Sequence, residues 1–178
     1  MLPSLKEVTP REGTSIISKD ISLSVEDGFA DEAKLLIQNL KEMGYNVTDK
    51  GQTVIALCHF PQNMQAKNDE HYRLDVKDKY ITVSGGTPHA IFNGTQTLVS
   101  LLKKQTIPAK LENIAINDYP DLLYRGMMLD IARNFTKKAD LLKLINQLAA
   151  YKINVLHFHF SDDEAWRLEI PGLEELTA

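Results

Sequence analysis

Residues 127–160 read MMLDIARNFTKKADLLKLINQLAAYKINVLHFHF, and this stretch decides the fold of the carboxyl-terminal part of the chain. Compact apolar runs at 127–131 and 155–160 predict two strands of a parallel sheet. Between them apolar side chains repeat at helical spacing, and Thr136 can cap a helix over 137–152. The apolar residues of this helix, which we expect to be buried, are Leu141, Leu144, Ile145 and Leu148. The order strand, helix, strand is the unit from which parallel sheets are built.

Upstream of this βαβ unit the pattern changes to short strands with two interposed helices. We expect strands at 21–25, 45–47, 53–58, 72–76, 80–84 and 114–116, and helices at 33–43 and 88–102. Gly44 is expected to close the first helix and Thr87 with Pro88 to open the second, while the polar turn 77–79 joins two strands as a hairpin. A polar, proline-containing joint follows the last strand. The sequence therefore predicts an α+β fold: a small sheet-and-two-helix sandwich over 1–117, followed over 118–178 by the βαβ unit.

Length and composition exclude several classes of protein. The chain has 178 residues, whereas a complete (β/α)₈ barrel needs about 250, so the βαβ unit is expected to be a truncated part of any such barrel. The net charge of -4 is spread along the chain without a clustered basic face, which argues against a nucleic acid partner. Cys58 is the only cysteine, which excludes an internal disulfide and a thiolate zinc site. No stretch reaches the roughly 20 apolar residues of a membrane span, and the first residues lack a signal-peptide hydrophobic region.

Two histidines near the end of the second predicted strand raise the question of a metal site. His157 and His159 are two residues apart in a strand and so point to the same face, with Asp162 and Asp163 close behind. Two imidazoles and a carboxylate could hold zinc or manganese, as in a metal phosphoesterase. The alternative is a pair of histidines that pack in the β layer and bond to their neighbours. We favour this second interpretation, because no distant third ligand group is visible.

Polar and aromatic side chains follow both predicted strands at their carboxyl ends, where open sheets and barrels place their functional groups. Arg133 follows the first strand, and its guanidinium could donate paired hydrogen bonds to substrate hydroxyls; the alternative is an exposed loop arginine. The acidic run 162–164 follows the second strand; it is either functional, or it is solvated or caps the next helix. Trp166 could stack on a sugar ring or merely cover the end of the sheet.

Two long motifs combine these signals. They are YRGMMLDIARNF at 124–135 and NVLHFHFSDDEAWRLEI at 154–170. With the helix between them, they closely resemble glycoside hydrolase family 20, the β-N-acetylhexosaminidases. AIFNGTQTL at 90–98 is similar to a helix of the small α+β domain that precedes the barrel in this family.

The resemblance implies an eight-stranded barrel that removes terminal N-acetylglucosamine or N-acetylgalactosamine with retention, through attack by the acetamido oxygen of the substrate. In the family an adjacent Asp-Glu pair on a later strand orients the acetamido group and protonates the leaving oxygen. The Asp-Glu pairs at 31–32, 69–70 and 163–164 do not match that context. We therefore expect the parent protein to be a glycosidase and this chain to be inactive by itself. The resemblance implies neither a cofactor nor a metal.

Individual residues carry over from the family only where the motifs match. Arg133 matches the arginine that binds hydroxyls of the terminal sugar. Asp162 matches an aspartate that supports the acid through a histidine farther along the chain. Other positions match the motif without an assigned role: His157, His159, Asp163 and Trp166. Arg125 is expected to help structure the barrel entrance, whereas Asn134 stands where the family commonly has histidine.

Three further expectations complete the interpretation. The rival function is a non-catalytic module in which the α+β domain binds a protein or a glycan. The apolar strands of the βαβ unit need cover, so we expect the chain to self-associate through residues 122–170. The resemblance places the parent protein in the periplasm or outside the cell.

Overall fold

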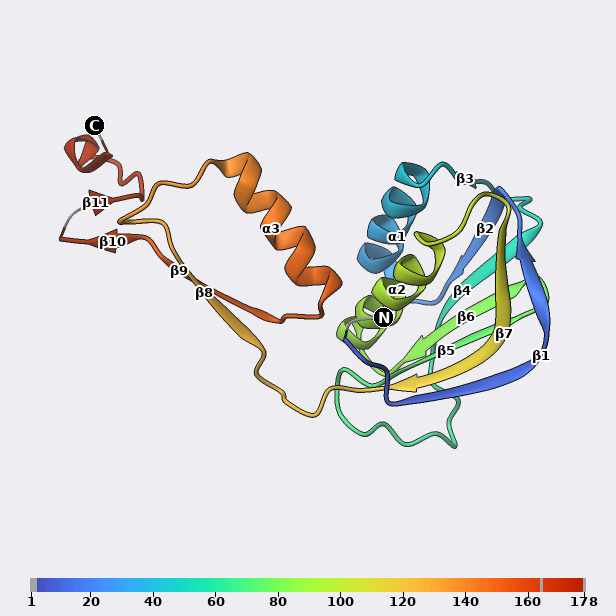
Figure 1. The fold of residues 1–178 in the computed structure, drawn as a ribbon. Coiled ribbons are helices and arrows are strands. Elements are labelled where there is room, and N and C mark those ends of the chain that lie inside the picture. The colour runs from blue at the N-terminus through green and yellow to red at the C-terminus, as the bar shows by residue number, and fades with distance from the viewer. Residues whose placement is uncertain (1–2, 164, 178) are drawn as a thin grey trace. The chain divides into compact units, whose positions relative to one another are not determined.

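The computed structural model describes residues 3–163 and 165–177. Contacts between Cα atoms divide the chain into two compact units, Met1–Asp121 and Leu122–Ala178 (Figure 1).

A seven-stranded mixed sheet forms the first unit, in the order β1-β7-β5-β6-β4-β2-β3. The strands are β1 (Glu7–Ile17), β2 (Asp20–Val25), β3 (Asn46–Val47), β4 (Thr53–His59), β5 (Tyr72–Lys77), β6 (Tyr80–Gly85) and β7 (Ala109–Asp118). The pairs β1–β7, β7–β5 and β5–β6 are antiparallel. The pairs β6–β4, β4–β2 and β2–β3 are parallel. β5 and β6 form the hairpin predicted from the sequence, with Asp78 in the left-handed region of its turn at φ 55°.

Two helices, α1 (Ala30–Glu42) and α2 (Pro88–Leu102), cover one face of this sheet (Figure 1). Gly44 has φ +95°, a conformation that glycine adopts without strain, and it ends the first helical segment as predicted. The Thr87 hydroxyl accepts a hydrogen bond from the Ala90 N–H and so caps α2, with Pro88 at the first helical position. Gly94 brings α2 close to the sheet, because a Cβ there would lie 2.4 Å from Val83 Cγ1.

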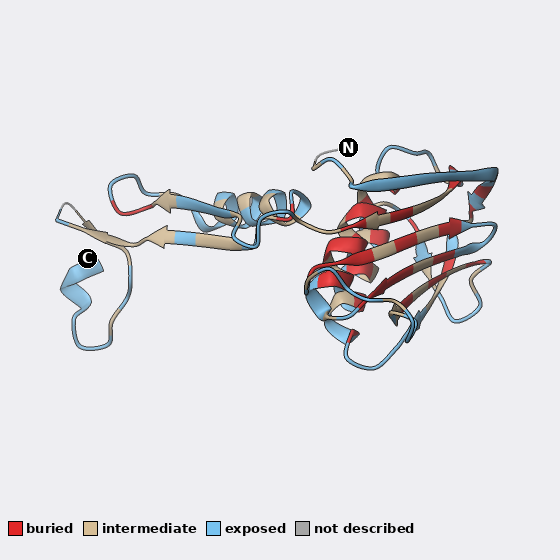
Figure 2. Ribbon diagram, turned by 90° about the horizontal axis from the view of Figure 1, so that it is seen from below, coloured by how far each residue is buried: buried red, intermediate tan, exposed pale blue. Residues whose placement is uncertain are grey.

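The core of this unit lies between the helices and the sheet, where Figure 2 shows the buried residues gathered. Its largest fully buried side chains are Tyr72, Phe29, Ile17, Ile21, Leu36, Leu40, Ile55, Leu57, Leu74, Ile81, Ile91 and Leu98. The alternation of buried and partly exposed residues along β4 and β5 follows from the period of two in a strand. The α+β class and the two helices predicted from the sequence are confirmed.

The sequence did not predict β1, although this strand is the longest of the unit. Nine of its eleven residues are exposed and the pairing with β7 is interrupted between Pro10 and Thr14, so the sequence shows little apolar alternation. β7 also begins earlier than the predicted strand, at Ala109.

The second unit contains the predicted βαβ order, with β8 (Gly126–Asp130), α3 (Lys138–Ala150) and β9 (Val155–His159). β8 and β9 are parallel, as predicted, with Gly126 opposite Val155 and Asp130 opposite His159. A small antiparallel pair, β10 (Ser161–Asp162) and β11 (Ala165–Trp166), follows, and a 3-10 turn, η1 (Glu174–Thr177), comes last. None of the described helices is long and apolar enough to cross a membrane.

Two expectations about α3 are wrong. The N-cap position is Lys137 and no side chain caps the helix, so Thr136 does not have the predicted role. No residue of α3 is buried, and Ile145 is 40% exposed. The physical reason is that, among the described residues, the sheet of β8 and β9 has two strands and is too narrow to cover the apolar side of a 13-residue helix.

Candidate functional site

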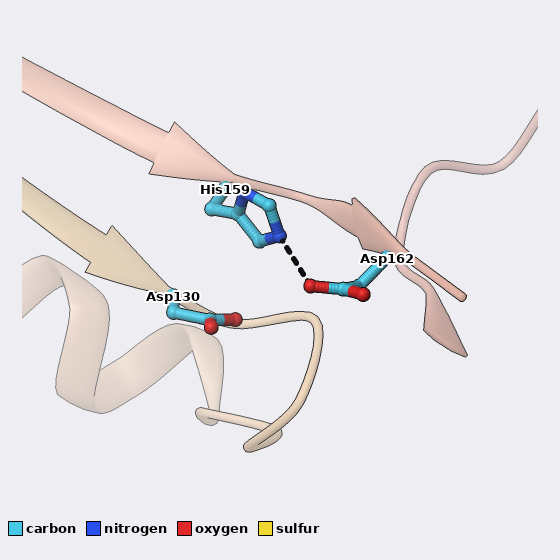
Figure 3. Close-up of side chains that lie close together, drawn as sticks. All are labelled: Asp130, His159 and Asp162. Carbon is cyan, nitrogen blue, oxygen red and sulfur yellow. Dashed lines mark hydrogen bonds and ion pairs between the residues drawn. The ribbon is translucent and has the colours of Figure 1, made fainter. Parts of the chain in front are cut away.

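The candidate site lies where β8 and β9 end. Because the two strands are parallel and Asp130 is opposite His159, their carboxyl ends bring the two side chains to the same edge. Asp162 from β10 completes the group, and Figure 3 shows the three side chains converging. Their nearest potential ligand atoms all lie within 4.8 Å of one another.

Asp130 binds the loop that follows its own strand. Its Oδ1 accepts hydrogen bonds from the backbone N–H groups of Ala132 and Arg133, at 3.0 and 3.1 Å. Its Oδ2 forms an ion pair with the guanidinium of Arg133 through Nε and Nη2. These contacts, with the Arg133 N–H as the largest cause, hold the pKa of Asp130 below its usual value.

Asp162 has contacts from three directions. Its Oδ2 accepts a hydrogen bond from Nε2 of His159 at 3.0 Å and lies 3.4 Å from Nε of Arg133. Its Oδ1 accepts from the backbone N–H of Asp163 at 2.8 Å. A hydrogen bond shared with the Asp163 side chain, followed by the bond from His159, lowers the pKa of Asp162 to about 2. The carboxylate is therefore ionised at any physiological pH.

The structure brings together only some of the predicted residues. Arg133, His159 and Asp162 meet, whereas His157 is exposed and has no part in the cluster of described side chains. Asp163 is exposed, and both its backbone N–H and its side chain form a hydrogen bond with Asp162. Trp166 is partly buried, and its indole N–H donates to the carbonyl of Leu168 at 2.7 Å. Glu164, the last member of the acidic run, lies outside the described residues.

Sequence reasoning missed two residues at this edge. The sequence marks Asp130 only as part of an apolar run, although a carboxylate at the last position of an apolar strand is a recognisable signal. Arg167 belongs to the second motif but had no role; its guanidinium donates to the carbonyls of Ile131 and Ala132. No local pattern reveals that contact, because it joins residues 35 and 36 positions apart.

Arg125 occupies the opposite end of the strands. Its Nε donates to the carbonyl of Lys152 at 2.8 Å and its Nη1 to that of Leu122 at 2.7 Å. Its backbone N–H donates to the Asn154 side chain, and its carbonyl accepts from Asn154 and Val155. These contacts tie the starts of β8 and β9 together.

A metal could reach Asp130, His159 and Asp162 by geometry alone. The guanidinium of Arg133, however, already supplies a positive charge to both carboxylates. A divalent cation would have to compete with this fixed charge. The arrangement is better suited to recognising a neutral polar ligand, since a planar guanidinium fixed by a carboxylate presents its N–H donors in a defined direction.

Comparison with known sequences divides the chain at nearly the same place as the structure. The profile described as glycosyl hydrolase family 20, domain 2, matches residues 1–119, and the profile described as glycosyl hydrolase family 20, catalytic domain, matches residues 122–178.

Individual relatives are similar to this chain over nearly its whole length. A β-hexosaminidase from Vibrio vulnificus is 37% identical over 99% of this chain and 20% of its own length. An N,N′-diacetylchitobiase from Vibrio harveyi is 34% identical over the same shares. The chain thus spans about a fifth of the length of these curated relatives.

Solved structures of family 20 enzymes have the same fold over nearly all of this chain. The exo-β-N-acetylglucosaminidase from Vibrio harveyi, crystallised with N-acetylglucosamine, superimposes with a TM-score of 0.86 at 29% identity, over 99% of this chain and 28% of the other. A β-N-acetylhexosaminidase from Streptomyces coelicolor superimposes with a TM-score of 0.78 at 28% identity, over 93% and 35% of the two chains.

Proposed function

The chain belongs to glycosyl hydrolase family 20, and on that premise we propose that the gene product containing it is a β-N-acetylhexosaminidase. The reaction removes terminal N-acetylhexosamine from glycans with retention, and the acetamido oxygen of the substrate acts as the nucleophile. Because this nucleophile is already tethered to the reacting sugar, its attack avoids the loss of entropy that bringing two molecules together would require. In this proposal residues 1–117 form the domain that precedes the barrel, and residues 118–178 begin the barrel itself.

One observation carries the proposal for this chain's own residues: the guanidinium of Arg133 is held between Asp130 and Asp162 at the carboxyl ends of two parallel strands. Barrel enzymes bind their substrates at this end of the strands. Arg133 donates hydrogen bonds to hydroxyls of the terminal sugar and so fixes the ring. Asp162 stays ionised and supports, through a histidine, the group that protonates the leaving oxygen.

Substitution of Arg133 tests the proposal. In the full-length gene product, Arg133→Ala should lower kcat/KM for an aryl β-N-acetylglucosaminide by about 10² or more, because a charged hydrogen bond to a buried ligand is lost. The kcat/KM of Arg133→Lys should lie between those of the unsubstituted enzyme and Arg133→Ala, since an ammonium keeps the charge but lacks the planar fork of a guanidinium. Arg11→Ala is the matched control, because Arg11 also pairs with an aspartate, Asp75, but in the other unit. A loss of less than about threefold for Arg133→Ala would remove this residue from substrate binding.

The 178-residue chain by itself is expected to be inactive on the same substrate. None of its Asp-Glu pairs matches the catalytic pair of the family, and general acid catalysis alone contributes factors of about 10² to 10⁴. The pair at 31–32 lies in the first turn of α1, and the Glu70 carboxylate of another pair accepts a buried hydrogen bond from Asn93. Activity that remains with the isolated chain through several chromatographic steps would contradict this expectation.

We also propose that the isolated chain self-associates through residues 122–170. Several large apolar side chains of this region are half exposed or more: Leu122, Leu123, Tyr124, Met128, Phe135, Leu142 and Tyr151. Exposed apolar surface of this extent favours association. Light scattering should give the molar mass of a dimer or a larger assembly. Met128→Glu should lower this mass toward that of the monomer, whereas Leu35→Glu in α1 should leave it unchanged. A monodisperse monomer of the unsubstituted chain at micromolar concentration would contradict the proposal.

For the site of action we propose the periplasm or the extracellular space, as the family resemblance implies. Glycans that carry terminal N-acetylhexosamine are the substrate class. Fractionation of source cells with an antibody against residues 1–117 tests this, and recovery of the gene product only with cytoplasmic markers would contradict it.

A further inference from the structure

We propose that Asp130 and Arg167 are positioning residues that hold Arg133 in its substrate-binding orientation by fixing the turn 131–133 from both sides. This inference rests on the proposed function, because it assigns a purpose to the fixed orientation of Arg133. Its structural part, however, can be tested without any substrate.

Asp130 holds the N–H side of the turn and the side chain of Arg133 together. One carboxylate oxygen accepts the backbone N–H groups of Ala132 and Arg133, and the other binds the guanidinium. The side chain of Asp130 is 20% exposed, whereas that of Arg133 is 52% exposed. A long exposed arginine without such a partner would sample many rotamers, and the bound carboxylate removes much of that freedom before a ligand arrives.

Arg167 holds the carbonyl side of the same turn. Its Nε donates to the carbonyls of Ile131 and Ala132 at 3.1 and 3.2 Å, and its Nη2 donates to that of Ala132 at 2.8 Å. Both residues are buried; Ala132 is fully so and Ile131 is 6% exposed. Because these peptide groups are shielded from water, their carbonyls depend on a protein donor.

Arg167 is itself fixed in place. Its backbone N–H donates to the carbonyl of Phe160 at 2.9 Å, and its guanidinium lies 5.5 Å from the centre of the Phe135 ring. The carbonyl of His159 completes the arrangement by accepting the N–H groups of Ile131 and Ala132. The turn that carries Arg133 is thus bonded on its N–H side by Asp130 and His159, and on its carbonyl side by Arg167.

Two conservative substitutions separate this role from simple packing. Asp130→Asn keeps the shape but weakens the hold on the guanidinium, and Arg167→Lys keeps the charge but cannot donate from a planar fork to two carbonyls. In the full-length gene product each should lower kcat/KM by about tenfold, since small misplacements of a binding group have effects of this size or more.

Coupling to Arg133 is the decisive measurement. In an Arg133→Ala background, Asp130→Asn and Arg167→Lys should cause almost no further loss, because there is no longer a guanidinium to position. Arg125→Lys is the matched control, since Arg125 also donates to backbone carbonyls of this unit but at the other end of the strands. Its effect on kcat/KM should add to that of Arg133→Ala. Losses from Asp130→Asn and Arg167→Lys that persist in full in the Arg133→Ala background would overturn the proposal.

A spectroscopic measurement on the 178-residue chain keeps the two proposals distinguishable. The Nε–H of Arg133 should give a resolved signal that exchanges slowly with water, and both Asp130→Asn and Arg167→Lys should broaden it or speed its exchange, whereas Arg125→Lys should not. An unaffected signal would overturn the positioning roles even if Arg133 binds substrate. If instead Arg133→Ala leaves activity unchanged while the signal responds as expected, the proposed substrate contact fails and the positioning contacts stand.

Discussion

Nε2 of His159 lies 3.0 Å from Oδ2 of Asp162, so the last residue of β9 directly contacts the short strand that follows it. The guanidinium of Arg133 reaches the same oxygen from the neighbouring loop at 3.4 Å. A carboxylate with these neighbours stays ionised and fixed in direction, as a group that supports a nearby acid needs to be. His157, two residues earlier, is exposed and shares none of these described contacts.

The titration of Asp162 in the isolated chain should reflect these neighbours. Its pKa is about 2 in the folded chain, below the value of about 3.9 for an unperturbed aspartate. Because the folded value is the lower one, the stabilisation is complete above the unfolded pKa and is lost as the pH falls through the folded pKa. Carbon-detected NMR should place the midpoint near 2, and His159→Gln should move it upward. A midpoint near 4 in the unsubstituted chain would show that the described contacts do not form in solution.

Asp162→Asn should affect catalysis more than binding. The amide keeps the size of the side chain but removes the charge that supports the acid, so we expect kcat to fall with little change in KM and the acid limb of the pH profile to shift. Steady-state kinetics of the full-length gene product across the pH range provide the measurement. Asp121→Asn is the control, because that exposed aspartate pairs only with Lys6 among the described residues. An unchanged pH profile for Asp162→Asn would remove Asp162 from the mechanism.

Two adjacent leucines of α1 should differ sharply in their contribution to stability. Leu36 is 1% exposed and belongs to the core, whereas Leu35 is 46% exposed. Leu36→Ala should lower the free energy of unfolding by about 2 to 5 kcal/mol, because it removes buried methyl groups and leaves a cavity. Leu35→Ala should change it by about 0.5 kcal/mol or less. Urea unfolding followed by circular dichroism measures both, and equal effects would mean that the helix packs on a different face.

The hydroxyl of Tyr72 should also contribute to stability. It lies 2.6 Å from the Thr97 hydroxyl and donates to Oδ2 of Asp118 at 2.7 Å, and burial raises the pKa of this tyrosine well above its usual value. Tyr72→Phe leaves the buried Asp118 carboxylate with one donor fewer, so the free energy of unfolding should fall by about 1 to 3 kcal/mol. Tyr80→Phe is the control, because Tyr80 is 63% exposed. If both variants unfold at the same urea concentration, the hydrogen bonds of the Tyr72 hydroxyl make no net contribution to the free energy of unfolding.

The sequence alone determined the elements whose signals are local. The hairpin around Asp78, the Thr87 cap of α2, the glycine that ends α1 and the parallel pair around α3 each depend on residues within a few positions, or on periodic apolar patterns. The motifs at 124–135 and 154–170 also identified the family, since both match along their length.

Only the tertiary structure decided which distant groups meet. β1 pairs with β7 about a hundred residues later, and its exposed, charged sequence carries no apolar alternation to predict a strand. Likewise, Asp130 is only three residues from Arg133 in sequence, but Arg167 reaches the same turn across 35 residues. The register of β8 against β9 sets the approach of Asp130 and His159. The physical reason is that periodicity and capping depend on neighbours along the chain, whereas hydrogen bonds between strands and loops depend on how the chain returns upon itself.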